Sequence, residues 1–259
     1  MKILIRETAA DAADCVAEII ARRVAARPEI VLGLATGGTM EAVYDRLIAR
    51  HRAGRFSLAR ATSFNLDEYV GLAPDHPCSY WRYMRERLFD HVDIDPARAH
   101  LPRGDAPDPE AEARRYEAAI AAAGDIGLQL LGLGHNGHIG FNEPTSSLAS
   151  LTRLKTLART TREANSRYFA RFEETPRLAL TMGIGTILRA EEIVLMATGL
   201  AKAQAVSAMV EGPLAAACPA SALQMHRRAT VVLDAAAAEG LRLRDYFEDV
   251  HPRDDDPDA

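Results

Sequence analysis

A glycine-rich stretch in the middle of the chain holds the side chains best suited to acid–base chemistry. Residues 131 to 144 read LGLGHNGHIGFNEP, and Asn136, His138 and Glu143 lie within eight residues of one another. Imidazole titrates near neutral pH, and a carboxylate within reach can orient the ring and raise its pKa. The pattern predicts a pair that moves one proton. The alternative is that one histidine belongs to the core and that Glu143 is a surface charge.

His135 and His138 in the same stretch also form an HxxH pair. A protein zinc site needs at least a third ligand, and none follows at a recognisable spacing on this glycine-rich loop. The pattern therefore predicts no metal site.

The stretch SFNLDEYVGL, residues 63 to 72, ends an apolar strand pattern at Asp67 and Glu68. Neighbouring side chains of an extended segment point to opposite sides, so we expect only one of the two carboxylates to face a cleft. That carboxylate could act as a base. The alternative is a solvated turn or a helix cap, which is the commoner role of an acidic pair after a strand.

A third stretch, LGLATGGT at residues 32 to 39, lies between a strand pattern and a helix pattern. The amides of Gly37 and Gly38 can converge on a phosphate at a helix N-terminus, and Thr36 and Thr39 can add hydroxyl groups. The alternative is an ordinary tight turn. Lys202, one of only three lysines, stands at another strand-to-helix junction, where its ammonium group suits a phosphate or is simply exposed.

Short apolar runs alternate with longer helical patterns along the whole chain. This rhythm predicts an α/β fold, with a mostly parallel sheet and helices on both faces. Ligands of such sheets bind beyond the carboxyl ends of the strands, which is where the three stretches lie. The predicted strands are 2–6, 30–35, 61–66, 128–133, 178–182, 193–197 and 230–233, and the predicted helices are 11–26, 40–53, 79–90, 109–122 and 202–211.

No linker, composition break or internal repeat divides the chain, so residues 1–250 are predicted to form a single domain. Residues 251–259 read HPRDDDPDA and are expected to be a disordered acidic tail.

The composition is that of a globular protein, with 48% hydrophobic and 26% charged residues. A net charge of −5 and the lack of a basic stripe predict no binding to nucleic acid or to an anionic membrane. No apolar run is long enough for a signal sequence or a membrane span, so a cytoplasmic location is expected. The three cysteines show no CxxC spacing and predict neither a disulfide framework nor a cysteine metal site.

Several motifs together resemble the glucosamine-6-phosphate deaminases. They run through nearly the whole chain and read GLATGGT, FNLDEYVGL, HPCSYWRYM, GHNGHIGFNEP, SSLASLTRLKT, ANSRYF, LTMGIGTIL and LQMH. The resemblance implies a Rossmann-like α/β fold and an enzyme of amino-sugar (N-acetylglucosamine) catabolism. Its implied reaction turns glucosamine 6-phosphate and water into fructose 6-phosphate and ammonia without a cofactor.

The resemblance also implies roles for individual residues. Asp67 matches the base that carries a proton between C2 and C1, His138 matches the acid–base residue of ring opening, and Glu143 matches its carboxylate partner. Asn136 stands where some members carry aspartate, so the orientation of His138 is expected to depend mainly on Glu143. The residues that match phosphate-binding groups are Thr36, Gly37, Gly38, Thr39, Arg167 and Lys202.

Some members of that family bind N-acetylglucosamine 6-phosphate at a second, activating site between subunits. The residues that match it here are Ser146, Arg153, Lys155, Thr156 and Tyr246. Arg153 and Lys155 alternate along an extended segment, so they would share a face, as two phosphate ligands should. The resemblance therefore implies an activator site and self-association as a homohexamer. An exposed strand edge protected by charge would give the same pattern.

Three other functions are alternatives. A non-catalytic sugar-phosphate sensor could use the same fold, although the joint presence of Asp67, His138 and Glu143 argues against it. A 6-phosphogluconolactonase-like hydrolase would act on a phosphorylated sugar lactone. A lyase could form a Schiff base through Lys202.

Overall fold

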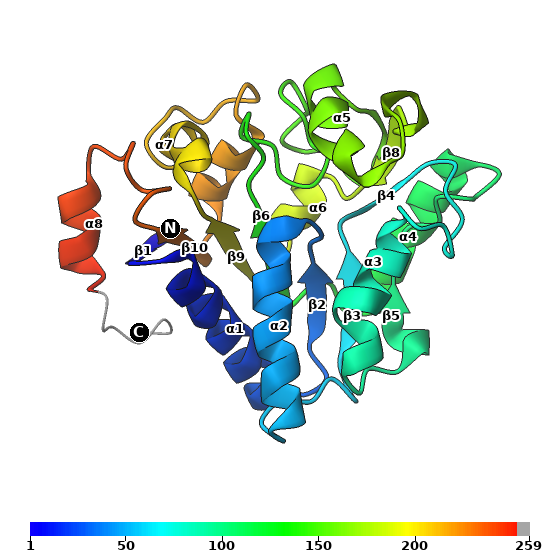
Figure 1. Cartoon of the computed structure of the whole chain (residues 1–259), viewed down its shortest axis with the longest axis horizontal. Coiled ribbons are helices and arrows are strands. Elements are labelled where there is room, and N and C mark those ends of the chain that lie inside the picture. Colours follow the sequence, from blue (N-terminus) through cyan, green and yellow to red (C-terminus); the bar gives the residue numbers. More distant parts are fainter. Residues whose placement is uncertain (253–259) are drawn as a thin grey trace.

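The computed structural model describes residues 1–252 and has a sheet of seven strands at its centre (Figure 1). The strand order is β1-β10-β9-β6-β2-β3-β5, and every neighbouring pair is parallel. This confirms the predicted mostly parallel sheet. The strands are β1 (Lys2–Arg6), β2 (Val31–Leu34), β3 (Thr62–Asn65), β5 (Ala99–His100), β6 (Leu128–Gly132), β9 (Glu192–Ala197) and β10 (Ala229–Asp234).

Helices cover this sheet, with α1 and α2 side by side in front of it in Figure 1. β2 is buried at all four positions, as a strand between two layers must be. Helix starts follow local capping: the Thr8 side chain accepts from the Asp11 amide before α1, and Asp108 caps α4. The helices are α1 (Ala9–Ala26), α2 (Gly38–Arg52), α3 (Tyr80–Arg87), α4 (Pro109–Ala122), α5 (Arg159–Asn165), α6 (Ile184–Leu188), α7 (Ala203–Val210) and α8 (Arg244–Val250).

A second, smaller sheet stands beside the carboxyl ends of the main strands. It contains β4 (Asp67–Tyr69), β8 (Leu178–Thr181) and β7 (Arg153–Thr156) in that order, and both pairs are antiparallel. The strand predicted at 178–182 is therefore confirmed as β8, but it does not belong to the parallel sheet. Leu66 links β3 directly to β4, so the chain passes from one sheet to the other immediately before Asp67.

The hydrophobic interior is divided in the same way. One large cluster of buried residues joins the strands of the main sheet to α1, α2, α3 and α4. A separate cluster beneath the small sheet has only four buried members, Tyr69, Phe141, Leu157 and Ala179. The ring of Tyr69 lies 5.5 Å from that of Phe141 and 5.7 Å from that of Phe169, measured between centroids. Aromatic contacts thus contribute to the packing beside β4.

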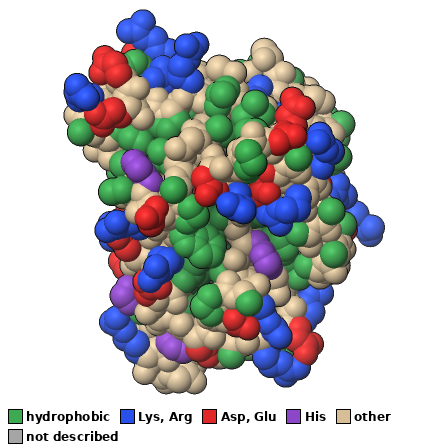
Figure 2. All heavy atoms as spheres, turned by 90° about the vertical axis from the view of Figure 1, so that its right-hand side faces the viewer, with side chains coloured by type: hydrophobic (Ala, Val, Ile, Leu, Met, Phe, Trp, Pro, Cys, Tyr) green, Lys and Arg blue, Asp and Glu red, His purple; other side chains and the backbone are tan. Residues whose placement is uncertain are grey.

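Basic and acidic side chains are interspersed on the face shown in Figure 2. In residues 1–252, no helix combines the length and the apolar character that crossing a lipid bilayer demands. Of the acidic tail predicted at 251–259, residues 253–259 lie outside the described residues.

Candidate active site

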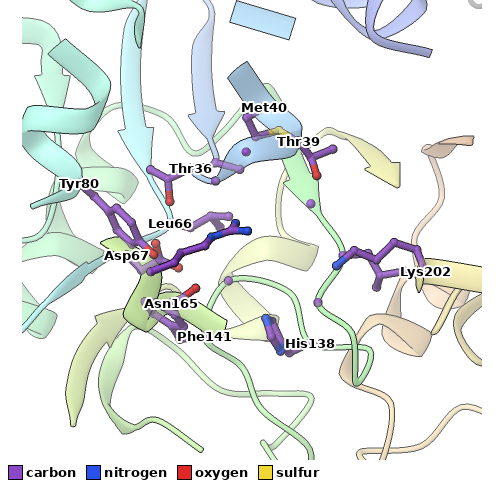
Figure 3. A pocket seen from close by; sticks show the side chains of 18 residues that line it. Thr36, Thr39, Met40, Leu66, Asp67, Tyr80, His138, Phe141, Asn165 and Lys202 are labelled. Atoms are coloured by element: carbon purple, nitrogen blue, oxygen red, sulfur yellow. The ribbon is translucent and has the colours of Figure 1, made fainter. Parts of the chain in front are cut away.

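A cavity of about 210 Å³ lies between the two sheets and collects most of the predicted site residues (Figure 3). It opens beyond the carboxyl ends of β2, β3 and β6, where a ligand of an open α/β sheet is expected. Asp67 and Lys202 reach it from opposite sides in Figure 3. The predicted residues that line it are Thr36, Gly37, Gly38, Thr39, Asp67, His138, Arg167 and Lys202.

The start of α2 forms one end of this cavity. Gly37 precedes the helix with a φ of 105°, a conformation that glycine adopts without strain, and no side chain caps the helix. The first amides of α2 therefore have no intrahelical acceptor and face the cavity end with a partial positive charge. The Tyr83 hydroxyl of α3 donates to the Gly37 carbonyl oxygen at 2.9 Å and fixes the loop. This arrangement suits a phosphate group.

Two cations face the same end. Lys202 ends the short 3-10 helix η5 (Leu200–Lys202), and Arg167 lies in the 3-10 helix η3 (Ser166–Tyr168), with its guanidinium carbon 4.8 Å from the centre of the Tyr168 ring. Burial lowers the pKa of Lys202, and the positive charge of Arg167 lowers it further. An anion between the two would relieve that repulsion, so their placement supports the predicted phosphate site.

Asp67 is 5% exposed and lines the cavity from β4. Burial raises its pKa to about 8, and the neighbouring Glu68 adds to the increase. Glu68 points to the other side and accepts hydrogen bonds from the amides of Tyr69, Tyr80 and Trp81 at 2.8, 3.0 and 3.0 Å. The expectation that only one of the two carboxylates faces the cleft is thus confirmed. Glu68 instead attaches β4 to the start of α3.

His138 belongs to a hydrogen-bonded chain of three side chains on the glycine-rich loop. The Asn136 amide nitrogen donates to the Glu143 carboxylate at 2.8 Å, which leaves the Asn136 carbonyl oxygen facing Nδ1 of His138 at 2.6 Å. A carbonyl oxygen can only accept, so Nδ1 carries the proton and Nε2 keeps its lone pair. His138 is therefore arranged to receive a proton through Nε2.

These hydrogen bonds correct the expectation that Glu143 would be the main group orienting His138. Nδ1 of His138 lies 3.6 Å from the Glu143 carboxylate, and the Asn136 amide is its direct partner. The expected rise in the histidine pKa is also wrong. Burial lowers the pKa of His138 to about 4, because it outweighs the opposite effect of Glu143. The imidazole is neutral at pH 7.

The residues predicted for an activator site do not all meet within one chain. Arg153, Lys155 and Thr156 lie on β7, and Arg153 donates to the Asn142 side-chain oxygen at 2.9 Å. The Ser146 hydroxyl is buried without a hydrogen-bond partner, as is one terminal nitrogen of Arg153. Tyr246 is on α8, which packs against β1 at the far edge of the main sheet (Figure 1).

Other residues of the site were not singled out by sequence patterns. Tyr80 and Asn165 line the cavity, and both are linked to the Tyr69 hydroxyl, at 3.2 and 3.0 Å. Thr161 of α5 donates to the Glu143 carboxylate. The motif ANSRYF contains Asn165, but polar residues with no titratable group give no separate signal of a site.

Comparisons with known proteins agree with this geometry. Residues 5–232 match a family described as glucosamine-6-phosphate isomerases/6-phosphogluconolactonase. The chain is 52% identical over 250 residues to a glucosamine-6-phosphate deaminase of Shewanella loihica, covering 96% of this chain and 93% of that one. It is 54% identical over 247 residues to one of Hahella chejuensis, covering 95% and 94%.

Solved structures give a similar result. A protein described as a monomeric glucosamine-6-phosphate deaminase superposes with a TM-score of 0.91 at 46% identity, covering 93% of this chain and all of that one. The 6-phosphogluconolactonase of Trypanosoma cruzi superposes with a TM-score of 0.76 at 19% identity, covering 93% and 97%. The second likeness is one of fold alone.

Proposed function

The chain belongs to the family of glucosamine-6-phosphate isomerases and 6-phosphogluconolactonases, and we propose that it is a glucosamine-6-phosphate deaminase. One observation carries this proposal: a single cavity combines an anion-binding end with Asp67 and His138. The substrate is glucosamine 6-phosphate, and the products are fructose 6-phosphate and ammonia. The enzyme would act in amino-sugar catabolism in the cytoplasm.

Phosphate binding aligns the sugar. The amides at the start of α2, the side chains of Thr36 and Thr39, and the cations Arg167 and Lys202 hold the phosphate on C6. Binding energy from this remote group keeps the reacting carbons beside Asp67 and His138.

Ring opening is the first chemical step. Nε2 of His138 takes the proton of the anomeric hydroxyl and delivers a proton to the ring oxygen, which breaks the bond between C1 and that oxygen. A neutral imidazole is the right starting form for accepting a proton. Its low pKa also makes the protonated form ready to release that proton.

Asp67 then moves a proton between two carbons. The aldehyde at C1 acidifies the hydrogen on C2, and the Asp67 carboxylate removes it and returns it to C1. C2 is oxidised as C1 is reduced, while the nitrogen on C2 gives up a proton and the oxygen on C1 gains one, which leaves an imine at C2 and a hydroxyl at C1. Water hydrolyses the imine to release ammonia and the ketone. Because the pKa of Asp67 is about 8, the free carboxyl is mostly protonated at pH 7 and must lose its proton before this step. A substrate amine bound as ammonium favours that ionisation.

The purified protein tests the proposal directly. Addition of glucosamine 6-phosphate should release ammonia and fructose 6-phosphate in equal amounts. A non-catalytic sensor would bind the sugar phosphate without ammonia release. A hydrolase would instead consume 6-phosphogluconolactone, and a lyase using Lys202 would be trapped on the sugar by borohydride.

We also propose that N-acetylglucosamine 6-phosphate activates the enzyme through Ser146, Arg153, Lys155 and Thr156, with Tyr246 supplied by another subunit of a homohexamer. The unpartnered buried atoms of Ser146 and Arg153 support a ligand at this place. One relative of known structure is described as monomeric, so assembly is tested separately. Analytical ultracentrifugation should show a hexamer, and the activator should lower the KM for glucosamine 6-phosphate. A monomer would reject the site between subunits.

A further inference from the structure

The short helix α5 lies against the loop that carries His138. Thr161 is in its first turn and is 3% exposed, and its hydroxyl donates to Oε1 of Glu143. We propose that Thr161 is a positioning residue for ring opening: it fixes the Glu143 carboxylate and, through it, the Asn136 amide and the His138 imidazole. This inference rests on the proposed deaminase function.

Each oxygen of the Glu143 carboxylate has its own donor. Thr161 donates to Oε1, and the Asn136 amide donates to Oε2 at 2.8 Å. The terminal torsion of a glutamate is soft, so a single donor leaves the carboxylate plane free to turn. Two donors from different segments hold that plane. Glu143 is only 5% exposed, so solvent has little access to replace a lost donor.

The alternative acceptor for the Thr161 hydroxyl is a backbone carbonyl, which would form a weaker hydrogen bond. A threonine in a helix commonly donates to a backbone carbonyl three or four residues earlier. A buried carboxylate accepts a stronger, charge-assisted hydrogen bond. The hydroxyl of Thr161 therefore stabilises the arrangement of Glu143 more than it stabilises α5.

The same segment connects ring opening to the phosphate. η3 follows α5 directly and carries Arg167 at the anion-binding end of the cavity. Thr161 and Arg167 are six positions apart on one continuous helical stretch. A phosphate held by Arg167 thus steadies the segment that supports the Glu143 carboxylate, so binding energy at C6 contributes to alignment at C1.

Asp67 is not part of the hydrogen-bonded series of Thr161, Glu143, Asn136 and His138. It lies on β4, and its proton transfer between C2 and C1 follows ring opening. Loss of the Thr161 hydroxyl should therefore impair a closed sugar but spare a substrate that cannot form a ring. A residue that only stabilises the fold would affect both substrates equally.

The test uses Thr161→Val, which keeps the shape and removes the donor, and Thr161→Ser, which keeps the donor. Thr160→Val is the matched control, because Thr160 is exposed on the same helix. The second substrate is the 4,5-dideoxy analogue of glucosamine 6-phosphate, which has no hydroxyl placed to close a furanose or pyranose ring. Circular dichroism and thermal melting confirm that each variant is folded.

Thr161→Val should lower kcat for glucosamine 6-phosphate about tenfold, leave KM within about threefold and leave kcat for the dideoxy analogue within about twofold. Thr161→Ser and Thr160→Val should remain within about threefold of the wild type on both substrates. Equal losses on the two substrates, an unimpaired Thr161→Val or a strongly impaired Thr161→Ser would each overturn the proposal.

A second measurement does not depend on turnover. Nitrogen-15 NMR of the histidine side chains, with the His138 signals assigned by their loss in His138→Gln, reports which ring nitrogen is protonated. The wild type should show Nδ1–H alone, and Thr161→Val should show a mixture of the two tautomers. If the wild type releases no ammonia but this shift occurs, the deaminase function is wrong and the positioning role stands. An unchanged tautomer in Thr161→Val would reject the role itself.

Discussion

The two sheets that border the cavity are held in place by different means. The seven-stranded sheet lies in the large buried cluster, whereas the three-stranded sheet packs on four buried residues. Hydrogen bonds supplement the smaller core: the Tyr69 hydroxyl is linked to Tyr80 at 3.2 Å and to Asn165 at 3.0 Å. Burial of apolar area stabilises the first sheet, and directional polar contacts determine the geometry of the second.

This difference matches what each sheet contributes to the site. The main sheet positions the start of α2, where a fixed backbone is enough to bind phosphate. The small sheet positions Asp67, whose carboxylate must meet a particular C–H bond. We therefore expect substitutions beside the main sheet to lower stability and substitutions beside the small sheet to lower activity.

The largest expected effect is that of Asp67→Asn. An amide cannot remove the C2 proton, so kcat should fall by about a thousandfold or more, while the substrate still binds through its phosphate. Ammonia release measures the loss, and calorimetric titration with glucosamine 6-phosphate measures binding. A variant that turns over at nearly the normal rate would show that another group is the base.

The same substitution should stabilise the fold at pH 8. The folded pKa of about 8 lies above the ordinary value of 3.8, so the native state binds the extra proton between these values and stability falls as pH rises through this window. Asparagine removes that cost. Asp67→Asn should raise the free energy of unfolding by about 1–3 kcal/mol at pH 8 and by almost nothing at pH 4.

His138→Gln should have the second largest effect. Glutamine cannot accept the proton of the anomeric hydroxyl, so kcat for the closed sugar should fall about a hundredfold. The loss on the 4,5-dideoxy analogue should be much smaller, because that substrate skips ring opening. Ammonia release from the two substrates gives the ratio, and equal losses would place His138 in the later steps.

Most of the main sheet was predictable from the sequence, because β1, β2, β6, β9 and β10 lie in apolar runs. The edge strand β5 was missed, since its two residues, Ala99 and His100, are too few to form a pattern. The second sheet was not recognised, since β4 has only three residues and two of them are acidic.

His138 was found because its imidazole titrates near neutral pH beside a carboxylate, whereas Asp67 was chosen over Glu68 only through the resemblance to a known family. The orienting role of Asn136 was missed because it depends on how its amide is turned between His138 and Glu143, which residue spacing does not reveal. The role of Thr161 was missed because it depends on a contact with Glu143, 18 residues away on another segment.

Two substitutions compare the two sheets directly. Leu195→Ala empties a fully buried position of β9 and should lower the free energy of unfolding by about 2–5 kcal/mol, with kcat within about twofold. Tyr69→Phe removes the shared hydroxyl and should cost about 1 kcal/mol of stability, with kcat/KM about fivefold lower. Denaturant titration and steady-state kinetics check both. Parallel losses of stability and activity in both variants would contradict the division between the sheets.

Glu68→Gln should have the smallest effect on activity, as a shift in the pH dependence of kcat/KM. In the wild type, kcat/KM should rise with pH, reach half its maximum near pH 8 and level off above that, because free Asp67 must be ionised and its pKa is about 8. His138 is already neutral over this range, since its pKa is about 4. The Glu68 charge makes Asp67 harder to ionise, so removing that charge should move the rise to lower pH.

The size of that shift measures how much of the raised Asp67 pKa comes from the Glu68 charge and how much from burial. Burial is the larger cause of the raised Asp67 pKa, so the profile should move by less than about one pH unit. The glutamine oxygen can still accept from the Tyr69 and Tyr80 amides, as Oε1 does in the wild type, which keeps β4 attached to the start of α3, whereas the Trp81 amide loses its acceptor. Glu86→Gln, an exposed change on the same helix, is the control and should leave the profile unchanged. A profile that moves to higher pH would show that Glu68 acts on Asp67 through its position and not through its charge.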